Sequence, residues 1–434
     1  MNIQILEKTQ DFLLKKSQKD CLDYRLSSKD LIRNRCLSFI SIVLFLISLK
    51  KKSLGISLEE FTSHFENHRV PSKSAFTQAR YKLKWEFFED WSSELVKNCT
   101  PYYRKTWKGF RLYGIDGSTL SLPDNKAMRK EFKFQVNDKC VKSQARIMCC
   151  YDVLNGFCYR AKLGSMTDSE VGVAYEWVKD FDSDSLCIYD RGFASFALIY
   201  LHQLYASNFV IRCQKNFNKS VSAFNASGKK SMVMDFQISN RAKEILLEQG
   251  IILDDSTTVK VRLLQIKLKT GEDEILITSL TDARKYRYNL FKDLYFLRWK
   301  TEVFYDRLKN KAQIEVFIGH KPVAVKQEFH ATIFLLNLQN LAIQQTSEQV
   351  RKNTKNRKYP YQTNYNVSFG FIAINVAELL KIGSDMTWFW EKIKAFCIKH
   401  VEPIRINREY PRKVGKHIKL NGKFYTATNY RRAI

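Results

Sequence analysis

The sequence lacks the segments by which proteins enter or cross membranes. Its N-terminus has no basic region followed by an apolar run, so it does not resemble a secretory signal peptide. The apolar run at 39–49 would form only about 16 Å of helix, which is too short for a bilayer. No long amphipathic or lipidation segment is present. We therefore expect a cytoplasmic protein with no membrane partner, in which residues 39–49 form a buried helix.

Cysteines at metal-binding or redox spacing are also missing. The chain has 10 cysteines, but they are scattered and include no Cys-x-x-Cys motif. Cys149 and Cys150 are adjacent, a spacing that does not suit a bridge between them. Reduced thiols are expected, as in a cytoplasmic protein.

Acidic residues are few relative to basic ones. The 72 Lys and Arg against 44 Asp and Glu give a formal net charge of +28. Such an excess favours a polyanionic partner, because each phosphate that is neutralised releases counterions. Nucleic acid is the first expectation, and an anionic membrane surface is the alternative. The ordinary apolar content of the chain excludes wholesale disorder.

The stretch 289–309 contains neither Gly nor Pro, and its periodicity predicts one continuous helix. Apolar residues recur at three- and four-residue steps: Leu290, Leu294, Leu297, Phe304 and Leu308. A second face carries one carboxylate among cations and phenols: Tyr295, Arg298, Glu302, Tyr305 and Lys309. This pattern is typical of a surface helix with salt-bridging charges. It also suits a helix that holds a metal through Glu302 while the cations bind phosphates.

Two short apolar runs each lead into an aspartate and a glycine-containing turn, at Asp116 and at Asp190. The order strand, Asp190, helix 195–205 and strand 209–212 predicts a βαβ unit, in which ligands bind at the carboxyl ends of the strands. A strand-end aspartate also serves as a turn former or helix cap. The recurrence of the pattern in a basic protein favours a functional pair.

Further strands are predicted at 144–153 and 157–163, on either side of an Asn-Gly turn that is typical of a hairpin. Together with the strand that carries Asp116, they predict a three-stranded antiparallel unit. Residues 215–280 contain short runs rich in Val and Thr, which predict a β-rich insertion.

These residues resemble a known family. The pattern Tyr-x2-Arg-x3-Glu-x6-Lys that begins at Tyr295 is similar to the Y-R-E-K signature of bacterial insertion-sequence DDE transposases, in the insertion-sequence-four-like group. Asp116, within Gly-Ile-Asp-Gly-Ser, and Asp190, within Asp-Arg-Gly-Phe, resemble the settings of the other two acids. Phe193 stands where Tyr is common in that family.

The resemblance implies an α/β fold with a ribonuclease-H-like core, in which a mixed sheet is flanked by helices. Asp116 would lie on the first strand, Asp190 at the end of the fourth, and Glu302 on a helix after the β-rich insertion. These acids would be catalytic and would hold two Mg²⁺ ions, for which Mn²⁺ can substitute, with Asp116 bridging the pair. The rest of the signature would bind DNA phosphates beside the cut: Tyr295, Arg298 and Lys309.

The implied function is that of a DNA transposase. It would bind the ends of an insertion sequence, cleave phosphodiesters and transfer the 3′-hydroxyl ends to target DNA. A homodimer on double-stranded DNA, associated with the bacterial nucleoid, is expected. Two alternatives stay open: a ribonuclease-H-like nuclease without strand transfer, and a non-catalytic DNA-binding derivative of a transposase.

Changes in sequence texture predict five segments. They are a helical N-terminal DNA-binding domain at 1–100, the first part of the core at 101–214, the insertion at 215–280, the second part of the core with the catalytic helix at 281–350, and a basic C-terminal region at 351–434. In the first segment a basic helix would project Gln78, Arg80, Lys82 and Lys84. Such a helix suits DNA docking, or it belongs to a helical scaffold with a solvated basic face.

Overall fold

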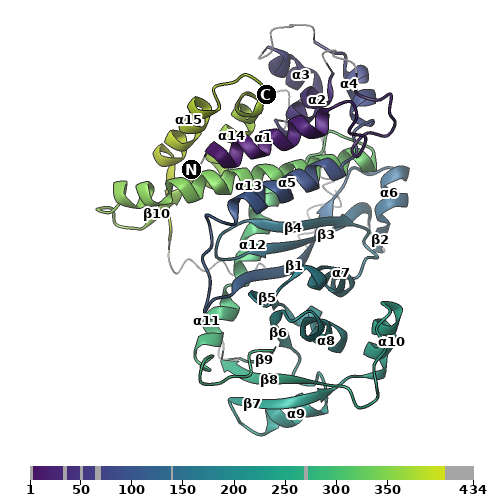
Figure 1. The fold of residues 1–434 in the computed structure, drawn as a ribbon, viewed down its shortest axis with the longest axis vertical. Coiled ribbons are helices and arrows are strands. Elements are labelled where there is room, and N and C mark those ends of the chain that lie inside the picture. The colour runs from purple at the N-terminus through teal and green to yellow at the C-terminus, as the bar shows by residue number, and fades with distance from the viewer. Residues whose placement is uncertain are drawn as a thin grey trace, which may run out of the picture. The chain divides into compact units, whose positions relative to one another are not determined.

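Two units divide the chain in the computed structural model, which describes residues 3–32, 37–48, 52–63, 70–137, 140–267 and 272–405 (Figure 1). The first unit comprises Met1–Cys99, Leu122–Met128 and Arg307–Ile434. The second comprises Thr100–Ser121 and Arg129–Asp306. The end of the predicted basic C-terminal region, from residue 406 onward, lies outside the described residues.

The first unit is built mainly of helices. Its N-terminal helices are α1 (Ile3–Ser17), α2 (Phe39–Ile47), α3 (Leu54–Thr62), α4 (Lys73–Arg80) and α5 (Glu86–Cys99). Its C-terminal helices are α13 (Pro322–Asn353), α14 (Tyr365–Leu380) and α15 (Met386–Lys399), followed by β11 (Val401–Pro403), which pairs with β10 (Tyr361–Thr363). None of the described helices is long and apolar enough to span a bilayer.

Helix α13 forms the core of the first unit, where it contacts α2, α5, α14 and α15. The indole ring of Trp91 on α5 stacks on Phe334 of α13 with 3.9 Å between ring centroids. The helix begins at Pro322, since Pro is favoured in a first helical turn. It continues to Asn353, into the first residues of the predicted basic C-terminal region at 351–434.

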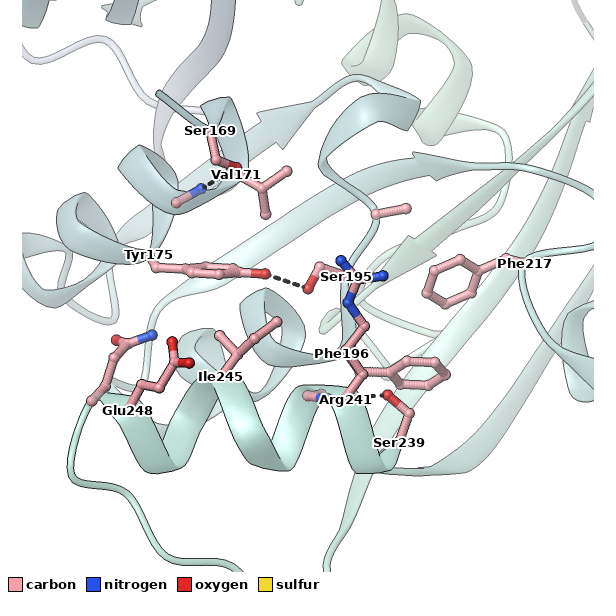
Figure 2. Close-up of a pocket in the computed structure, with 14 residues that line it drawn as sticks. Ser169, Val171, Tyr175, Ser195, Phe196, Phe217, Ser239, Arg241, Ile245 and Glu248 are labelled. Carbon is pink, nitrogen blue, oxygen red and sulfur yellow. Dashed lines mark hydrogen bonds between the residues drawn. The ribbon is translucent and has the colours of Figure 1, made fainter. Parts of the chain in front are cut away.

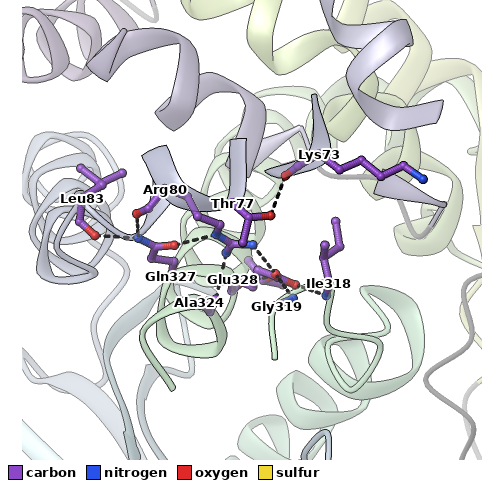
Figure 3. A network of polar contacts seen from close by, with 10 residues as sticks. Lys73, Thr77, Arg80, Leu83, Ile318, Gly319, Ala324, Gln327 and Glu328 are labelled. Carbon is purple, nitrogen blue, oxygen red and sulfur yellow. Dashed lines mark hydrogen bonds and ion pairs between the residues drawn. The ribbon is translucent and has the colours of Figure 1, made fainter. Parts of the chain in front are cut away.

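Arg80 corrects a prediction about the basic helix of this unit. The sequence suggested that Arg80 projects toward DNA, but its side chain is only 2% exposed. Figure 3 shows its guanidinium turned inward, with Nη1 donating to Glu328 Oε1 at 3.1 Å and Nε to Gln327 Oε1 at 3.0 Å. A buried guanidinium requires such partners, so Arg80 ties α4 to α13.

The second unit is organised around a mixed sheet that has nine strands within the described residues. The strand order is β2-β3-β1-β5-β6-β9-β8-β7, and β4 pairs with β3. The strands are β1 (Arg111–Ser121), β2 (Phe134–Asn137), β3 (Cys140–Asp152), β4 (Cys158–Gly164), β5 (Ser185–Tyr189), β6 (Asn208–Cys213), β7 (Ser231–Gln237), β8 (Thr258–Lys267) and β9 (Asp273–Thr278). A mixed sheet flanked by helices confirms the predicted α/β class and its ribonuclease-H-like arrangement.

Several predicted elements are confirmed. Strands β3 and β4 form the expected hairpin and are antiparallel, as are β1 and β3. Strands β5 and β6 are parallel and are joined by α8 (Phe196–Leu204), which is the predicted βαβ unit. Figure 1 shows α8 beside α7 (Glu170–Trp177), and both pack on an apolar cluster on one face of the sheet.

The predicted β-rich insertion extends the sheet. Strands β7, β8 and β9 form antiparallel pairs, and β9 also pairs with the core strand β6. The same segment contains the helices α9 (Lys219–Ala226) and α10 (Asn240–Glu248). The segment therefore continues the core sheet through β9.

Candidate active site

Two of the predicted acids, Asp116 and Asp190, lie beside each other on adjacent parallel strands. Asp190 directly follows the end of β5, as predicted, but the turn predicted at Asp116 is wrong, because β1 continues through Gly117 to Ser121 and stays paired with β3. Ile115 on β1 pairs with Tyr189 on β5, which in turn pairs with Ile211 on β6. The residues that follow these three are therefore side by side: Asp116, Asp190 and Arg212. Because Ile115 and Tyr189 face the apolar cluster and side chains alternate along a strand, these polar side chains face the opposite side of the sheet.

The helix predicted at 289–309 is broken, which corrects the expectation of one continuous element. It forms α11 (Leu290–Phe296), α12 (Trp299–Asp306) and a π-helical turn at Arg307–Lys311. Between α11 and α12 the backbone hydrogen bonds connect residues three apart, from Arg298 N to Tyr295 O and from Thr301 N to Arg298 O. Tight turns of this kind inside a helix often mark functional positions. The break lies at the signature residues Tyr295 and Arg298.

Arg298 connects two of the predicted acids. Its Nη1 donates to Asp116 Oδ2 at 3.1 Å, and its Nη2 donates to Glu302 Oε1 at 2.8 Å. The backbone N–H of Gly117 donates to the other oxygen of Asp116, Oδ1, at 2.9 Å. Asp116 and Glu302 therefore share one guanidinium.

Asp190 accepts hydrogen bonds from two other side chains. Arg212 Nε donates to its Oδ1 at 2.8 Å, and Arg212 Nη2 lies 2.7 Å from the same oxygen. The phenol of Tyr295 also donates to Oδ1, at 3.3 Å. The third nitrogen of Arg212, Nη1, donates to Glu274 Oε1 on β9 at 2.7 Å.

The environment separates the pKa values of the two aspartates. Burial raises the pKa of Asp116 to about 6, and the nearby charges of Asp190 and Glu302 add to the rise while Arg298 opposes it. Burial also raises the pKa of Asp190, but the Arg191 backbone N–H and the cations Arg298 and Arg212 outweigh burial and hold it below its ordinary value. Two carboxyls with opposite shifts are typical of functional sites.

Tyr305, whose role the sequence left open, contacts the backbone of β1 at Asp116. Its buried hydroxyl donates to the carbonyl oxygen of Asp116 at 2.5 Å. Burial raises the pKa of this phenol, so it stays a donor. The sequence also left open whether Trp299 packs in the core, but its side chain is 46% exposed. Lys309 lies in the π-helical turn, which belongs to the first unit, and its phosphate-binding role stays a prediction.

The chemistry of the three carboxylates suits divalent metal ions. Carboxylate oxygens are preferred ligands of Mg²⁺ and Mn²⁺, and adjacent strands bring Asp116 and Asp190 to roughly 4.8 Å between backbones. As placed, no group of three His, Cys, Asp or Glu side chains in the described ranges is close enough to hold a metal. Arg298 lies between Asp116 and Glu302, so metal binding by these carboxylates would require its guanidinium to move away.

A separate pocket of about 580 Å³ lies on the other face of the sheet. Figure 2 shows it between α10 and the N-terminal ends of α7 and α8. The hydroxyls of Tyr175 and Ser195 share a hydrogen bond there, and the side chain of Arg241 points toward Ser195. Its lining packs against the apolar cluster. In the described part of the chain, none of the predicted site residues lines this pocket.

Sequence reasoning missed Arg212 and Glu274. One signal was available for Arg212. It ends the predicted strand 209–212, which is the second strand of the predicted βαβ unit, and Asp190 ends the first strand. Parallel neighbouring strands end at the same edge of a sheet, so this arginine should lie beside the aspartate. Glu274 had no comparable signal, because its position depends on how the insertion pairs with β6.

Comparisons with known proteins identify the family of this chain. A sequence profile of the family described as "Transposase DDE domain" matches residues 107–338. The Escherichia coli (strain K12) protein "Transposase InsG for insertion sequence element IS4" is 24% identical over 315 residues, covering 70% of this chain and 68% of that protein. A cryo-EM structure of piggyBac transposase synaptic complex with hairpin DNA covers 94% of this chain and 87% of that one, at 11% identity and a TM-score of 0.43, which is too low to establish a shared fold. Because the matched profile spans more than half of its length, the chain belongs to the transposase family that carries the DDE domain, and the resemblance to insertion-sequence-four-like transposases is confirmed.

Proposed function

We propose that this transposase cleaves phosphodiesters at the ends of an insertion sequence and joins the 3′-hydroxyl ends to target DNA, with Asp116, Asp190 and Glu302 as its catalytic acids. The observation that carries the proposal is the shared contact of Asp116 and Glu302 with Arg298, beside Asp190 on the next strand. Three acids beside an arginine that can bind two oxygens at once are expected at a phosphoryl-transfer site. A structural salt bridge would need only one acid and one cation.

Each site residue has a role that follows from its chemistry. The three carboxylates would hold two divalent ions, Mg²⁺ or Mn²⁺, which would supply positive charge to stabilise the attacking and leaving oxygens of an in-line displacement. Arg298 can exchange its two carboxylate partners for two phosphate oxygens, because its fork matches both groups. Tyr295 orients Asp190 through its hydroxyl and lies beside the bound strand. Lys309 contributes a point charge to a phosphate.

DNA carrying the inverted repeats that flank the gene provides the test. The purified chain with Mg²⁺ or Mn²⁺ should nick this DNA, and Asp116→Asn, Asp190→Asn and Glu302→Gln should each abolish nicking while binding in a gel-shift assay persists. Glu272→Gln is the matched control, because it removes an exposed charge from the same unit. If Glu302→Gln cut at close to the unmodified rate, the assignment of the acids would be wrong.

A second assay separates transposition from the alternatives. A precut end with a free 3′-hydroxyl should be joined to plasmid DNA, whereas a nuclease would nick without joining. A non-catalytic derivative would bind the ends and cut with neither ion. Crosslinking of the DNA complex should yield a homodimer, since two ends must be held together.

A further inference from the structure

Arg212 connects two acids, of which only Asp190 belongs to the proposed catalytic set. Two of its nitrogens, Nε and Nη2, contact the same oxygen of Asp190, Oδ1, at 2.8 and 2.7 Å. The third, Nη1, donates to Glu274 Oε1 at 2.7 Å. The three side chains are 20–31% exposed, so their charges are only partly screened by solvent.

This geometry differs from the usual pairing of arginine with a carboxylate. A guanidinium on a single carboxylate commonly donates to both oxygens at once. Here it is turned so that it uses one oxygen of Asp190, and Tyr295 donates to that oxygen as well. The far side of the guanidinium, Nη1, is bound to Glu274 on β9.

Strand pairing fixes where Glu274 acts. Arg212 pairs with Leu276 on β9, and Glu274 lies two residues earlier on that strand, on the same face. Its carboxylate therefore lies on the side of Arg212 away from Asp190.

We propose that Glu274 and Arg212 are positioning residues for metal binding: Glu274 holds Arg212 on Oδ1 of Asp190 and so keeps Oδ2 available to a metal ion. This inference rests on the proposed function, because it assigns Asp190 as a metal ligand. Without Glu274, the guanidinium turns onto both oxygens of Asp190 and competes with the cation. Groups that orient metal ligands typically change metal affinity by about 10- to 100-fold when they are removed.

The test measures Mn²⁺ binding to the DNA-free protein by calorimetry or electron paramagnetic resonance. Glu274→Ala should weaken binding about 10-fold, and Glu274→Gln should largely restore it, because the amide oxygen still accepts from Arg212. The decisive variant is the double substitution Glu274→Ala with Arg212→Met. It should bind Mn²⁺ more tightly than Glu274→Ala alone, since the competing cation is gone.

Glu272→Ala controls for the loss of charge, because it removes a carboxylate two residues away in an exposed position. Equal weakening by Glu272→Ala and Glu274→Ala would overturn the inference, and so would a double variant that binds no better than Glu274→Ala. Thermal unfolding of each variant separates a lost fold from a lost site. If Asp190→Asn abolishes cleavage while Glu274→Ala leaves Mn²⁺ binding unchanged, the positioning role fails and the proposed function stands. If Asp190→Asn still cleaves, the proposed function fails.

Discussion

Arg298 donates to Glu302 across one helical turn, from Nη2 to Oε1 at 2.8 Å, while its other terminal nitrogen binds Asp116. The guanidinium thus supplies positive charge where the proposed mechanism requires metal ions. The two roles compete, because a carboxylate oxygen that accepts from Arg298 is less available to a cation. Binding of metal and release of Arg298 toward a DNA phosphate are therefore expected to be linked.

Replacing Arg298 by Met tests this competition. Without metal, Arg298→Met should lower the free energy of unfolding by about 1.5–3 kcal/mol, because hydrogen bonds to charged groups are lost. Saturating Mn²⁺ should then raise the melting temperature more in Arg298→Met than in the unmodified chain, since the ion displaces no guanidinium. Arg287→Met, which removes an exposed cation from the same unit, should not change the metal-induced shift. A smaller shift in Arg298→Met would contradict the competition.

Gly114 and Thr301 make a close contact that a double-mutant cycle can measure. A Cβ added at Gly114 would overlap Thr301 Oγ1 and lie 3.1 Å from Val153 Cγ1. Gly114→Ala should therefore cost about 1–3 kcal/mol of stability, as is typical of overpacking. Combining it with Thr301→Ala should cost less than the sum of the two single changes, because the new methyl group occupies the vacated space. Strict additivity in urea unfolding would exclude the contact.

Thr301→Val is expected to act in the opposite direction. The Thr301 hydroxyl is buried and has no hydrogen-bond partner within the described part of the chain. Val has nearly the same shape without the hydroxyl, so it should stabilise the protein by about 1 kcal/mol. Thr301→Ser keeps the hydroxyl and removes the methyl group, so it should destabilise.

Features set by local sequence were predicted well. The strand end at Asp190 and the β3–β4 hairpin follow from apolar runs and turn residues within a few positions, whereas the strand end predicted at Asp116 was wrong, because pairing with β3 extends β1 to Ser121. The helix break at Arg298 did not follow from the periodicity, and Arg298 contacts Asp116, a residue 182 positions away that periodicity cannot identify. Arg80 was misplaced for the same reason, since its partner Glu328 is 248 positions distant. Helical periodicity identifies the polar face but not what the face contacts.

Buried His202 predicts a specific pH dependence of stability. Its ring nitrogens lie 2.9 Å from the Tyr189 hydroxyl and 2.7 Å from Ser207 Oγ, and burial lowers its pKa to about 3. The folded pKa is below the unfolded value of about 6.5. The stability that His202 contributes is therefore complete above pH 6.5 and is lost as the pH falls toward 3, at about 1.4 kcal/mol per pH unit.

The variant His202→Gln isolates this effect. Gln retains hydrogen-bonding groups but does not titrate, so its stability deficit relative to the unmodified chain should shrink by about 2 kcal/mol between pH 7 and pH 5. Urea unfolding at the two pH values measures the difference, and carboxyl titrations common to both proteins cancel. A deficit that is unchanged or larger at pH 5 would show that His202 is not held neutral.

The buried ion pair of Arg80 and Glu328 should contribute far more to stability than the exposed pair of Lys82 and Asp30. The side chains are 2% and 5% exposed, and Glu328 also accepts from the backbone N–H groups of Ile318 and Gly319. Arg80→Met leaves a buried carboxylate without its cation and should cost about 3–5 kcal/mol. Adding Glu328→Gln should recover part of this cost, because the neutral amide can still accept from one backbone N–H. Lys82→Ala breaks a pair in which Lys82 is 48% exposed and should cost at most about 1 kcal/mol. Chemical denaturation of the full chain measures all three, and equal costs for Arg80→Met and Lys82→Ala would show that Arg80 is solvated, as the sequence had suggested.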